Sequence, residues 1–425
     1  MKWFTRTLLG TWIVLLAFDG FFRYACTTAS LPWLAYLKDV VSVALLGAFA
    51  VRSVGRLRLH LVVLAAVGII TYGAVVGLLY GISAVAVAFA VKMFLPFLVG
   101  YLAMAQGYLD SAASKRLYRW VTPCIALGVL LDLVVVLPWT GLSYDLAGVT
   151  LEASREWTTF GLQRPAGFGR SSFETAIALY TLLVLRFGIR DDGETRDRRL
   201  PRAYDAILAI ASVTAIGFTT SKTSILALCL FCVTLLLRAG MRHSWVLFRH
   251  MSRIALSTVM VFALVLTLVP FFIPQGTANQ LDDTLSKYGL IPKLMFQSLV
   301  ERAQDVWPRA AHSMSPPLLS LTGRGLGGVG APQLYFAPDQ YNPADNVHVY
   351  LWLSFGIVIL LLLVAGLGVL IGRLARAPAP DAALVSFLAT LLAFGATLNV
   401  IEAPMLMLGL GILLAAHEGV WNDGH

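Results

Sequence analysis

Three residues close together in the last quarter of the chain carry polar side chains, and two of these side chains could accept a proton. They are Asp345, Asn346 and His348, in the stretch "PADNVHVYLW" that opens a long apolar run. His348 follows Asp345 by three residues, so a helix that included both would place them on one face. A carboxylate and an imidazole on one face are candidates for general acid–base catalysis on a hydroxyl group. We therefore treat this stretch as a candidate catalytic site.

A second group of residues combines positive charge with glycine or with the end of a helix. The stretches are "QRPAGFGRSSF", "TTSKTS" and "TGRGLGGVG". Glycine lets backbone N–H groups approach an anion closely, and arginine binds phosphate oxygens through two parallel hydrogen bonds. The pattern predicts a diphosphate-bearing ligand, and the alternative is a set of solvated loop charges. The candidate diphosphate-binding residues are Arg164, Arg170, Lys222, Arg302, Arg309 and Arg324.

The remaining motifs indicate neither a nucleotide site nor a metal site. The stretch "GRGLGGVG" lacks the Lys-Ser/Thr pair of a P-loop and follows no strand–helix alternation. The four cysteines lie in or beside apolar runs, where small buried side chains are the usual interpretation. We expect no metal ion and no cofactor.

Ionisable residues inside apolar runs are energetically expensive and are therefore candidates for function. We keep three of them as a candidate intramembrane site: Lys92, Glu174 and Glu402. For the others we favour ion pairing or a place in the lipid headgroup region: Asp19, Lys38, Asp39, Asp132 and Asp205.

These residues must be positioned by a membrane domain. The chain has 425 residues, of which 58% are hydrophobic and 13% charged, whereas soluble domains carry about 25% charged residues. No polar stretch is long enough for a soluble domain, so we predict one membrane domain over residues 1–425. The net charge of +9 is explained by cytoplasmic loops rich in Lys and Arg. Nucleic-acid binding is disfavoured because no basic patch lies on a soluble module.

The apolar runs predict an all-α fold. A spanning helix needs about 20 mostly apolar residues, and on that template we place about twelve helices. Their predicted ranges are 7–22, 33–51, 61–80, 84–105, 120–139, 172–189, 203–220, 223–238, 254–273, 346–372, 383–401 and 403–418. The ninth and tenth helices are separated by a large loop, 274–345, which has helical patterning of its own.

The distribution of Lys and Arg predicts the orientation in the membrane. With the N-terminus in the cytoplasm, most basic residues fall in cytoplasmic loops, as the positive-inside rule requires. Residues 140–171 and 274–345 then form the two long loops on the outer face. Loops of this length in a compact domain usually carry function, so we place the active site on the periplasmic side of the membrane.

The motifs together resemble the bacterial O-antigen ligase/polymerase superfamily, which acts on undecaprenyl-diphosphate-linked glycans. The resemblance covers nearly the whole chain in its topology. It is carried by "RPAGFGRSSFETA", "TTSKTS" and "WPRA", and by "GRGLGGVG", "DNVHVYLWLSFGI" and the closing "NVIEAPMLMLGLG". The resemblance implies a multi-pass glycosyltransferase of the bacterial inner membrane.

The resemblance also implies roles for the candidate catalytic residues. In this superfamily the last loop ends with His-Asn, and those positions fall here on Asp345 and Asn346, counted back from Gly356. Asp345, with His348 one turn later, would then deprotonate the acceptor hydroxyl. An Asp-Asn pair is typical of polymerases more than of ligases. Lys222 stands where an arginine is usual, which keeps the charge but loses the two-bond fork.

We therefore expect a metal-independent, inverting polymerase that joins lipid-linked repeat units into O-antigen, capsular or exopolysaccharide. Its partners would be the undecaprenyl-diphosphate-linked glycan, the lipid bilayer and a chain-length regulator protein. The first alternative is an O-antigen ligase that transfers the finished glycan to lipid A–core. The second alternative is a lipid flippase or transporter, which should place its charges in a cavity reached from both sides.

Overall fold

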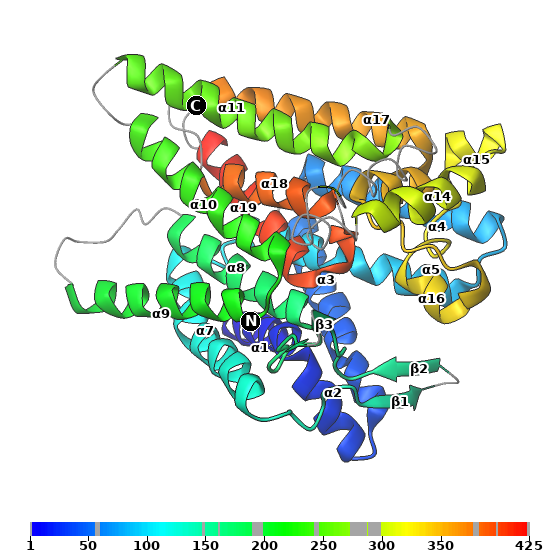
Figure 1. Ribbon diagram of the computed structural model, residues 1–425, viewed down its shortest axis with the longest axis horizontal. Coiled ribbons are helices and arrows are strands. Elements are labelled where there is room, and N and C mark those ends of the chain that lie inside the picture. The colour runs from blue at the N-terminus through cyan, green and yellow to red at the C-terminus, as the bar shows by residue number, and fades with distance from the viewer. Residues whose placement is uncertain are drawn as a thin grey trace.

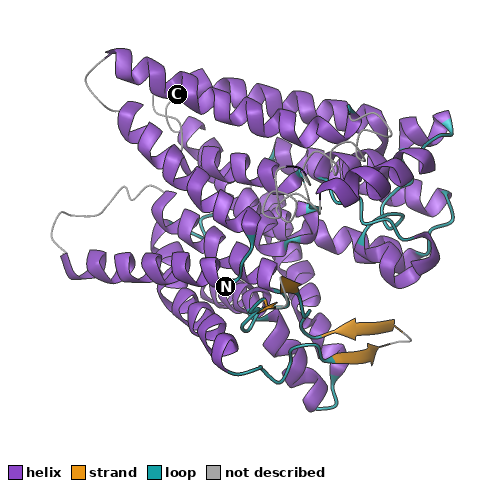
Figure 2. Cartoon of the chain, in the orientation of Figure 1, coloured by secondary structure: helices purple, strands orange, loops and turns teal. Residues whose placement is uncertain are grey.

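The protein is a helical bundle with two short β-hairpins (Figures 1 and 2). The computed structural model describes residues 2–55, 60–146, 149–159, 162–188, 199–241, 246–272, 287, 299–376, 382–396 and 398–422. Most of the helical patterning predicted in the first part of the 274–345 loop therefore lies outside the described residues.

The first half of the chain contains seven α-helices, two short 3-10 helices and four strands among the described residues. These elements are α1 (Lys2–Ala17), α2 (Asp19–Thr28), η1 (Pro32–Tyr36), α3 (Leu37–Gly55), α4 (Leu61–Leu79), α5 (Ala84–Val91), η2 (Lys92–Phe94), α6 (Leu95–Ala105), α7 (Ser111–Val134), β1 (Ser143–Leu146), β2 (Val149–Glu152), β3 (Thr158–Thr159) and β4 (Leu162–Gln163).

The second half contains only helices and loops among its described residues. Its elements are α8 (Ser172–Gly188), α9 (Arg199–Phe218), α10 (Lys222–Met241), α11 (Val246–Leu268), η3 (Val269–Phe271), the π-helix η4 (Arg302–Val306), α14 (Trp307–Ser313), α15 (Pro317–Thr322), α16 (Ala331–Phe336), η5 (Pro338–Gln340), α17 (Val347–Arg376), α18 (Ala382–Gly395), η6 (Val400–Glu402) and α19 (Pro404–Asn422).

Several of these helices can cross a membrane. Among the described residues, five are long and apolar enough: Pro32–Ser53, Leu61–Leu79, Ala84–Ala105, Ala112–Val134 and Val347–Leu374. The pair formed by α1 and α2 would be a sixth span, with a bend of 89° between its halves. Five shorter apolar helices accompany them. The prediction of a helical membrane protein is confirmed, and the count of twelve spans stays a prediction.

Three predicted helix boundaries are wrong for identifiable local reasons. The helix predicted over 7–22 is broken near Phe18, where the chain turns from α1 into α2. The helix predicted from 120 begins at Ser111, because the Asp110 carboxylate accepts a hydrogen bond from Ala113 N–H at 2.7 Å and caps it. The helix predicted over 383–401 ends at Gly395.

The loop between α7 and α8 contains strands that the sequence patterning did not predict. β1 pairs with β2 in antiparallel register, and β3 pairs with β4. Trp139, Tyr144 and Leu151 form a small apolar cluster at the base of the first hairpin. The hairpin projects from the same end of the bundle as α14, α15 and α16 (Figure 1). This end therefore carries the two long loops together.

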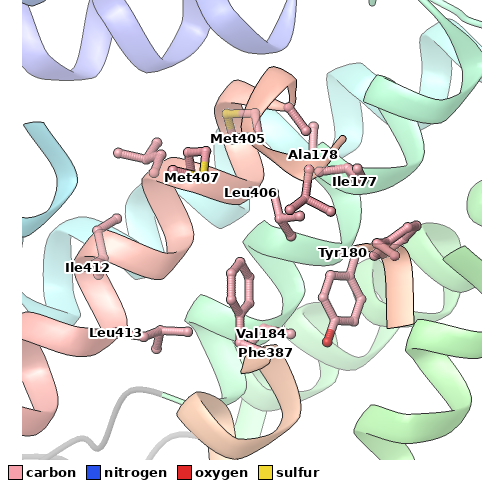
Figure 3. Close-up of a cluster of buried hydrophobic side chains, with 14 of the residues drawn as sticks. Ile177, Ala178, Tyr180, Val184, Phe387, Met405, Leu406, Met407, Ile412 and Leu413 are labelled. Carbon is pink, nitrogen blue, oxygen red and sulfur yellow. The ribbon is translucent and has the colours of Figure 1, made fainter. Parts of the chain in front are cut away.

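The main core lies where α8, α18 and α19 meet. Tyr180 and Phe387 stack with ring centroids 6.1 Å apart, and the Tyr180 hydroxyl lies 2.6 Å from Thr390 Oγ1 (Figure 3). α19 also packs closely along α6, because a Cβ at Gly411 would lie 2.2 Å from Phe97 O. α19 therefore packs against helices from both halves of the chain.

The glycine-rich loop packs its backbone against two helices. α17 is interrupted at Gly356, which frees the carbonyls of the preceding turn. Arg324 N–H donates to Leu353 O at 2.7 Å, and Gly325 N–H donates to Ser354 O at 3.1 Å. Gly325 has a φ of +82°, and a Cβ there would lie 2.0 Å from Gly77 N in α4. The glycines of this loop therefore allow close packing of backbone on backbone.

Replacing Gly325 with alanine tests this packing. Gly107 is the matched control, because it has a φ of +70° and a Cβ added there would meet nothing within 4 Å. We expect Gly107→Ala to cost about 1–2 kcal/mol for the left-handed backbone alone. Gly325→Ala should cost about 1–3 kcal/mol more, because the methyl group overpacks the contact with α4. Equal shifts of the thermal unfolding midpoint in detergent would contradict this account.

Candidate functional site

A cavity of about 370 Å³ is lined by residues of both long loops. Its wall is made by segments far apart in sequence, from the α1–α2 break to η6. Six basic and five acidic side chains line it: Arg23, Lys38, Lys92, Arg155, Arg170, Arg302, Asp19, Asp39, Glu174, Asp345 and Glu402. The fold therefore gathers the ionisable residues of several apolar segments in one place.

One wall of the cavity is held together by a buried ion triad of Asp19, Arg23 and Lys38. The Asp19 carboxylate accepts a hydrogen bond from Arg23 Nε at 2.9 Å and forms an ion pair with Lys38 Nζ. Arg23 also donates to the Tyr144 hydroxyl at 3.1 Å. The triad joins α2 to α3 and to the first hairpin. Only 8% of Lys38 is exposed, and its ion pair agrees with the structural role that was predicted for it.

The predicted intramembrane residue Lys92 is neutralised by a carboxylate from a neighbouring helix. Lys92 Nζ lies 3.1 Å from Asp39 Oδ2, and the ammonium stands 4.0 Å above the centre of the Phe89 ring. A lysine at this depth needs such a partner, since a lone charge away from water is strongly unfavourable. Lys92 therefore belongs to the structural part of the cavity wall.

Two arginines that line the cavity, Arg155 and Arg170, lie on neighbouring loop segments. Arg155 N–H donates to Arg170 O at 2.7 Å, which holds the two residues side by side. Arg170 donates through Nη2 to the Tyr335 hydroxyl at 3.0 Å, while its buried Nε has no partner among the described residues. Arg155 is paired with Glu152, at 3.3 Å, whose own side chain is half exposed. The pair can thus offer several N–H groups to an anion.

Asp345 is the predicted catalytic residue that reaches this cavity. It stands just before α17 with a φ of +42°, and Arg302 Nε lies 3.1 Å from its carboxylate. Burial raises the pKa of the Asp345 carboxyl, and the Arg302 guanidinium offsets this only in part. A carboxylate with a raised pKa is a better proton acceptor than an exposed one. Asp345 is therefore suited to take a proton from a hydroxyl group.

Glu402 supplies a second, partly buried carboxylate to the same cavity. Its Oε1 accepts hydrogen bonds from Ala331 N–H at 2.9 Å and from Asn399 Nδ2 at 3.0 Å. Burial raises the pKa of Glu402, against the effect of these donors. Burial and the charges of Glu402 and Asp345 together raise the pKa of Tyr341 to about 12. The two carboxylates therefore act on one phenol, which stays protonated at neutral pH.

The other two predicted catalytic residues do not line the cavity. Asn346 caps α17: its Oδ1 accepts from His348 N–H at 2.9 Å and from Val349 N–H at 3.0 Å, and its amide donates to Thr267 O. His348 is 3% exposed and lines neither of the two large cavities. The expectation of one shared face is wrong because Asp345 precedes the helix and adopts a positive φ.

The predicted diphosphate-binding residues fall into different places. Arg170 and Arg302 line the cavity. Arg164 does not, because its Nε donates to Thr219 O at 3.2 Å, next to the turn from which Lys222 begins α10. Arg309 is more than half exposed and pairs with Asp305 at 2.6 Å. Arg324 lines a second cavity, described below. The six residues therefore do not form one site.

Two further predictions about acidic residues agree with the structure. Asp132 accepts hydrogen bonds from Ala166 N–H at 2.7 Å and Gly167 N–H at 2.9 Å, so it anchors the "PAGFG" stretch to α7. Asp205 forms ion pairs with Arg119 and Arg186. Both are structural, as expected. Glu174, the remaining intramembrane candidate, lines the charged cavity from the first turn of α8.

Four residues of the cavity wall were not predicted as site residues: Arg155, Arg23, Tyr335 and Tyr341. Arg155 is a basic residue in a long loop that was predicted to lie on the outer face, and that alone could have selected it, although no glycine stands beside it. Arg23 follows Asp19 by four residues, a spacing that predicts an ion pair on one helix face. The two tyrosines carry no signal in the sequence, since only the folded loop brings them to the cavity.

Among the described residues, no group of three or more His, Cys, Asp or Glu side chains has the geometry of a metal site. Comparisons with protein-family models, with curated proteins and with solved structures found no match to this chain. The chemistry of the cavity must therefore be argued from its own side chains.

Replacing Asp19 with asparagine tests the ion triad. The variant removes the carboxylate that pairs directly with both Arg23 and Lys38, which should cost about 3–5 kcal/mol of stability. Asp339→Asn is the control, because Asp339 is exposed in η5, and it should change stability by less than about 0.5 kcal/mol. The measurement is thermal unfolding of both purified variants in one detergent. A negligible shift for Asp19→Asn would show that the triad does not hold the cavity wall.

Proposed function

We propose that the protein is a membrane glycosyltransferase that joins undecaprenyl-diphosphate-linked oligosaccharide units into a surface polysaccharide or exopolysaccharide. The observation that carries the proposal is the charged cavity, in which Arg155 and Arg170 share a pocket with the carboxylate of Asp345. Such a site can bind an anionic leaving group and accept a proton in the same reaction.

The arginine pair is suited to a diphosphate. Diphosphate oxygens accept charge-assisted hydrogen bonds from guanidinium groups. Two adjacent arginines can offer one guanidinium group to each of the two phosphates. As the glycosidic bond to the diphosphate breaks, negative charge grows on the leaving oxygen. Arg155 and Arg170 would stabilise that charge in the transition state.

Asp345 would activate the acceptor. The acceptor hydroxyl oxygen attacks the anomeric carbon of the donor glycan, and the bond from that carbon to the diphosphate oxygen breaks. The hydroxyl proton passes to Asp345 and later to water. Attack from the face opposite the leaving diphosphate inverts the anomeric centre. Arg302, at 3.1 Å, holds the Asp345 carboxylate in place. We expect the reaction to proceed without a divalent metal ion or a cofactor.

The position of the site supports an outward-facing orientation. If twelve helices cross the bilayer from a cytoplasmic N-terminus, the breaks before α2, α3, α8 and α17 all fall on the outer face. The cavity is lined from these breaks. We therefore propose an active site at the periplasmic face of a bacterial inner membrane. The polysaccharide product could then meet a chain-length regulator protein on that side.

Reconstitution with a single lipid substrate tests the function. Purified protein given only undecaprenyl-diphosphate repeat units, with EDTA present, should produce a ladder of longer lipid-linked glycans. Arg170→Ala should lower the rate on the order of a hundredfold, and Asp345→Asn by about a hundredfold or more. Arg373→Ala should leave the rate unchanged, because Arg373 is exposed at the far end of α17.

Each other outcome favours a different function. Glycosylation of added lipid A–core without a ladder would identify a ligase and overturn the polymerase proposal. Movement of the unchanged lipid-linked unit across the bilayer would identify a flippase, and both transferase proposals would fall. Near-normal ladders from both Arg170→Ala and Asp345→Asn would exclude the charged cavity as the active site.

A further inference from the structure

A second cavity, of about 430 Å³, lies beside the first and has a different character. It is formed by the turn between α4 and α5, the glycine-rich loop and α16. Arg324 is the single charged side chain in its lining, which contains no aspartate or glutamate among the described residues. The charges of the first cavity nearly balance, whereas this cavity carries an uncompensated positive charge.

Arg324 lines the cavity, and no acidic side chain of the described lining pairs with its guanidinium group. Its backbone N–H donates to Leu353 O at 2.7 Å, which fixes the residue against α17. Within the described part of the chain, its guanidinium group makes no hydrogen bond and no ion pair. Around it the cavity offers the Gln340 amide and the Ser83 hydroxyl, which already accepts a hydrogen bond from Ala86 N–H at 3.2 Å and keeps its O–H as a donor. These groups are suited to an anion.

The surroundings of this cavity are suited to a lipid. Leu79 and Leu318, each adjacent in sequence to a lining residue, are 80% and 63% exposed, and Leu321 is 51% exposed. Exposed leucines beside a polar pocket in a membrane protein can contact hydrocarbon while the pocket takes a headgroup. An anionic headgroup with an apolar tail therefore fits better than a soluble anion.

The two cavities are separated by a thin aromatic wall. Phe89 of α5 packs on Tyr335 and Phe336 of α16, with ring centroids 5.4 Å and 5.9 Å apart. Phe89 and Tyr335 line the charged cavity, whereas Phe336 lines the second one. The two cavities therefore lie on opposite sides of one cluster of three aromatic rings.

We propose that the Arg324 cavity binds the diphosphate headgroup of the second lipid-linked substrate, the acceptor. This inference rests on the proposed function, because polymerisation joins two molecules that each carry a lipid diphosphate. The donor diphosphate occupies the Arg155–Arg170 pair, and the acceptor diphosphate is held by Arg324. The glycan of the acceptor extends toward Asp345, so that its terminal hydroxyl meets the donor.

Binding stoichiometry tests the inference without any chemistry. Native mass spectrometry of the purified full chain with undecaprenyl diphosphate should show two bound molecules. Arg324→Ala and Arg170→Ala should each retain one, and the Arg373→Ala control should retain two. In the elongation assay, Arg324→Ala should raise the lipid-linked unit concentration for half-maximal rate about tenfold or more. Arg324→Lys, which keeps the charge, should recover part of that loss.

The failures of this inference and of the proposed function can be told apart. If the wild type makes a ladder but Arg324→Ala still binds two molecules, the second site is wrong and the polymerase stands. If the wild type forms no ladder but Arg324→Ala still binds one molecule fewer than the wild type, the second lipid-diphosphate site is supported and the proposed polymerase function is wrong. Displacement of the second molecule by equimolar inorganic pyrophosphate or phosphatidylglycerol would overturn the assignment to a lipid diphosphate.

Discussion

Mutual neutralisation of buried charge is the interaction on which this structure depends. An isolated ion in an apolar bundle is too costly to keep, so each charge in the cavity wall needs a partner nearby. Asp19 meets this need for Arg23 and Lys38 at once, and Asp39 meets it for Lys92. These pairs join α2, α3, η2 and the first hairpin around one cavity. Few hydrogen-bond donors of the cavity therefore remain for a ligand, and these are mainly the guanidinium groups of Arg155 and Arg170.

Close backbone packing provides the second constraint. The break of α17 at Gly356 exposes carbonyls that receive the N–H groups of Arg324 and Gly325. The glycine-rich loop is thereby pinned between α4 and α17, and its arginine is turned to the cavity beside α5. The same loop leads into α16, whose tyrosine lies in the charged cavity and whose Phe336 lies in the other. One packed loop thus places residues in both cavities.

The sequence predicted the helical membrane fold and part of the site, and the limits have physical causes. Long apolar runs form helices whatever they pack against, so the presence of the helices could be predicted from the sequence. Arg170 and Arg302 were predicted from positive charge beside glycine or a helix end, Asp345 from its spacing to His348, and Glu402 from charge inside an apolar run; all four line the cavity. The three-residue spacing wrongly placed His348 on one helix face with Asp345, because Asp345 lies outside the helix. Nor could spacing show that Arg324 faces a separate cavity, because that depends on packing against α4 and α17.

The most direct test of the central claim is a cryo-electron microscopy structure of the protein in lipid nanodiscs with undecaprenyl diphosphate. If the charged cavity binds the donor leaving group, diphosphate oxygens should lie about 2.7–2.9 Å from guanidinium nitrogens of Arg155 and Arg170. The carboxylate of Asp345 should line the same occupied cavity. A diphosphate bound away from both arginines, with the charged cavity empty, would contradict the account.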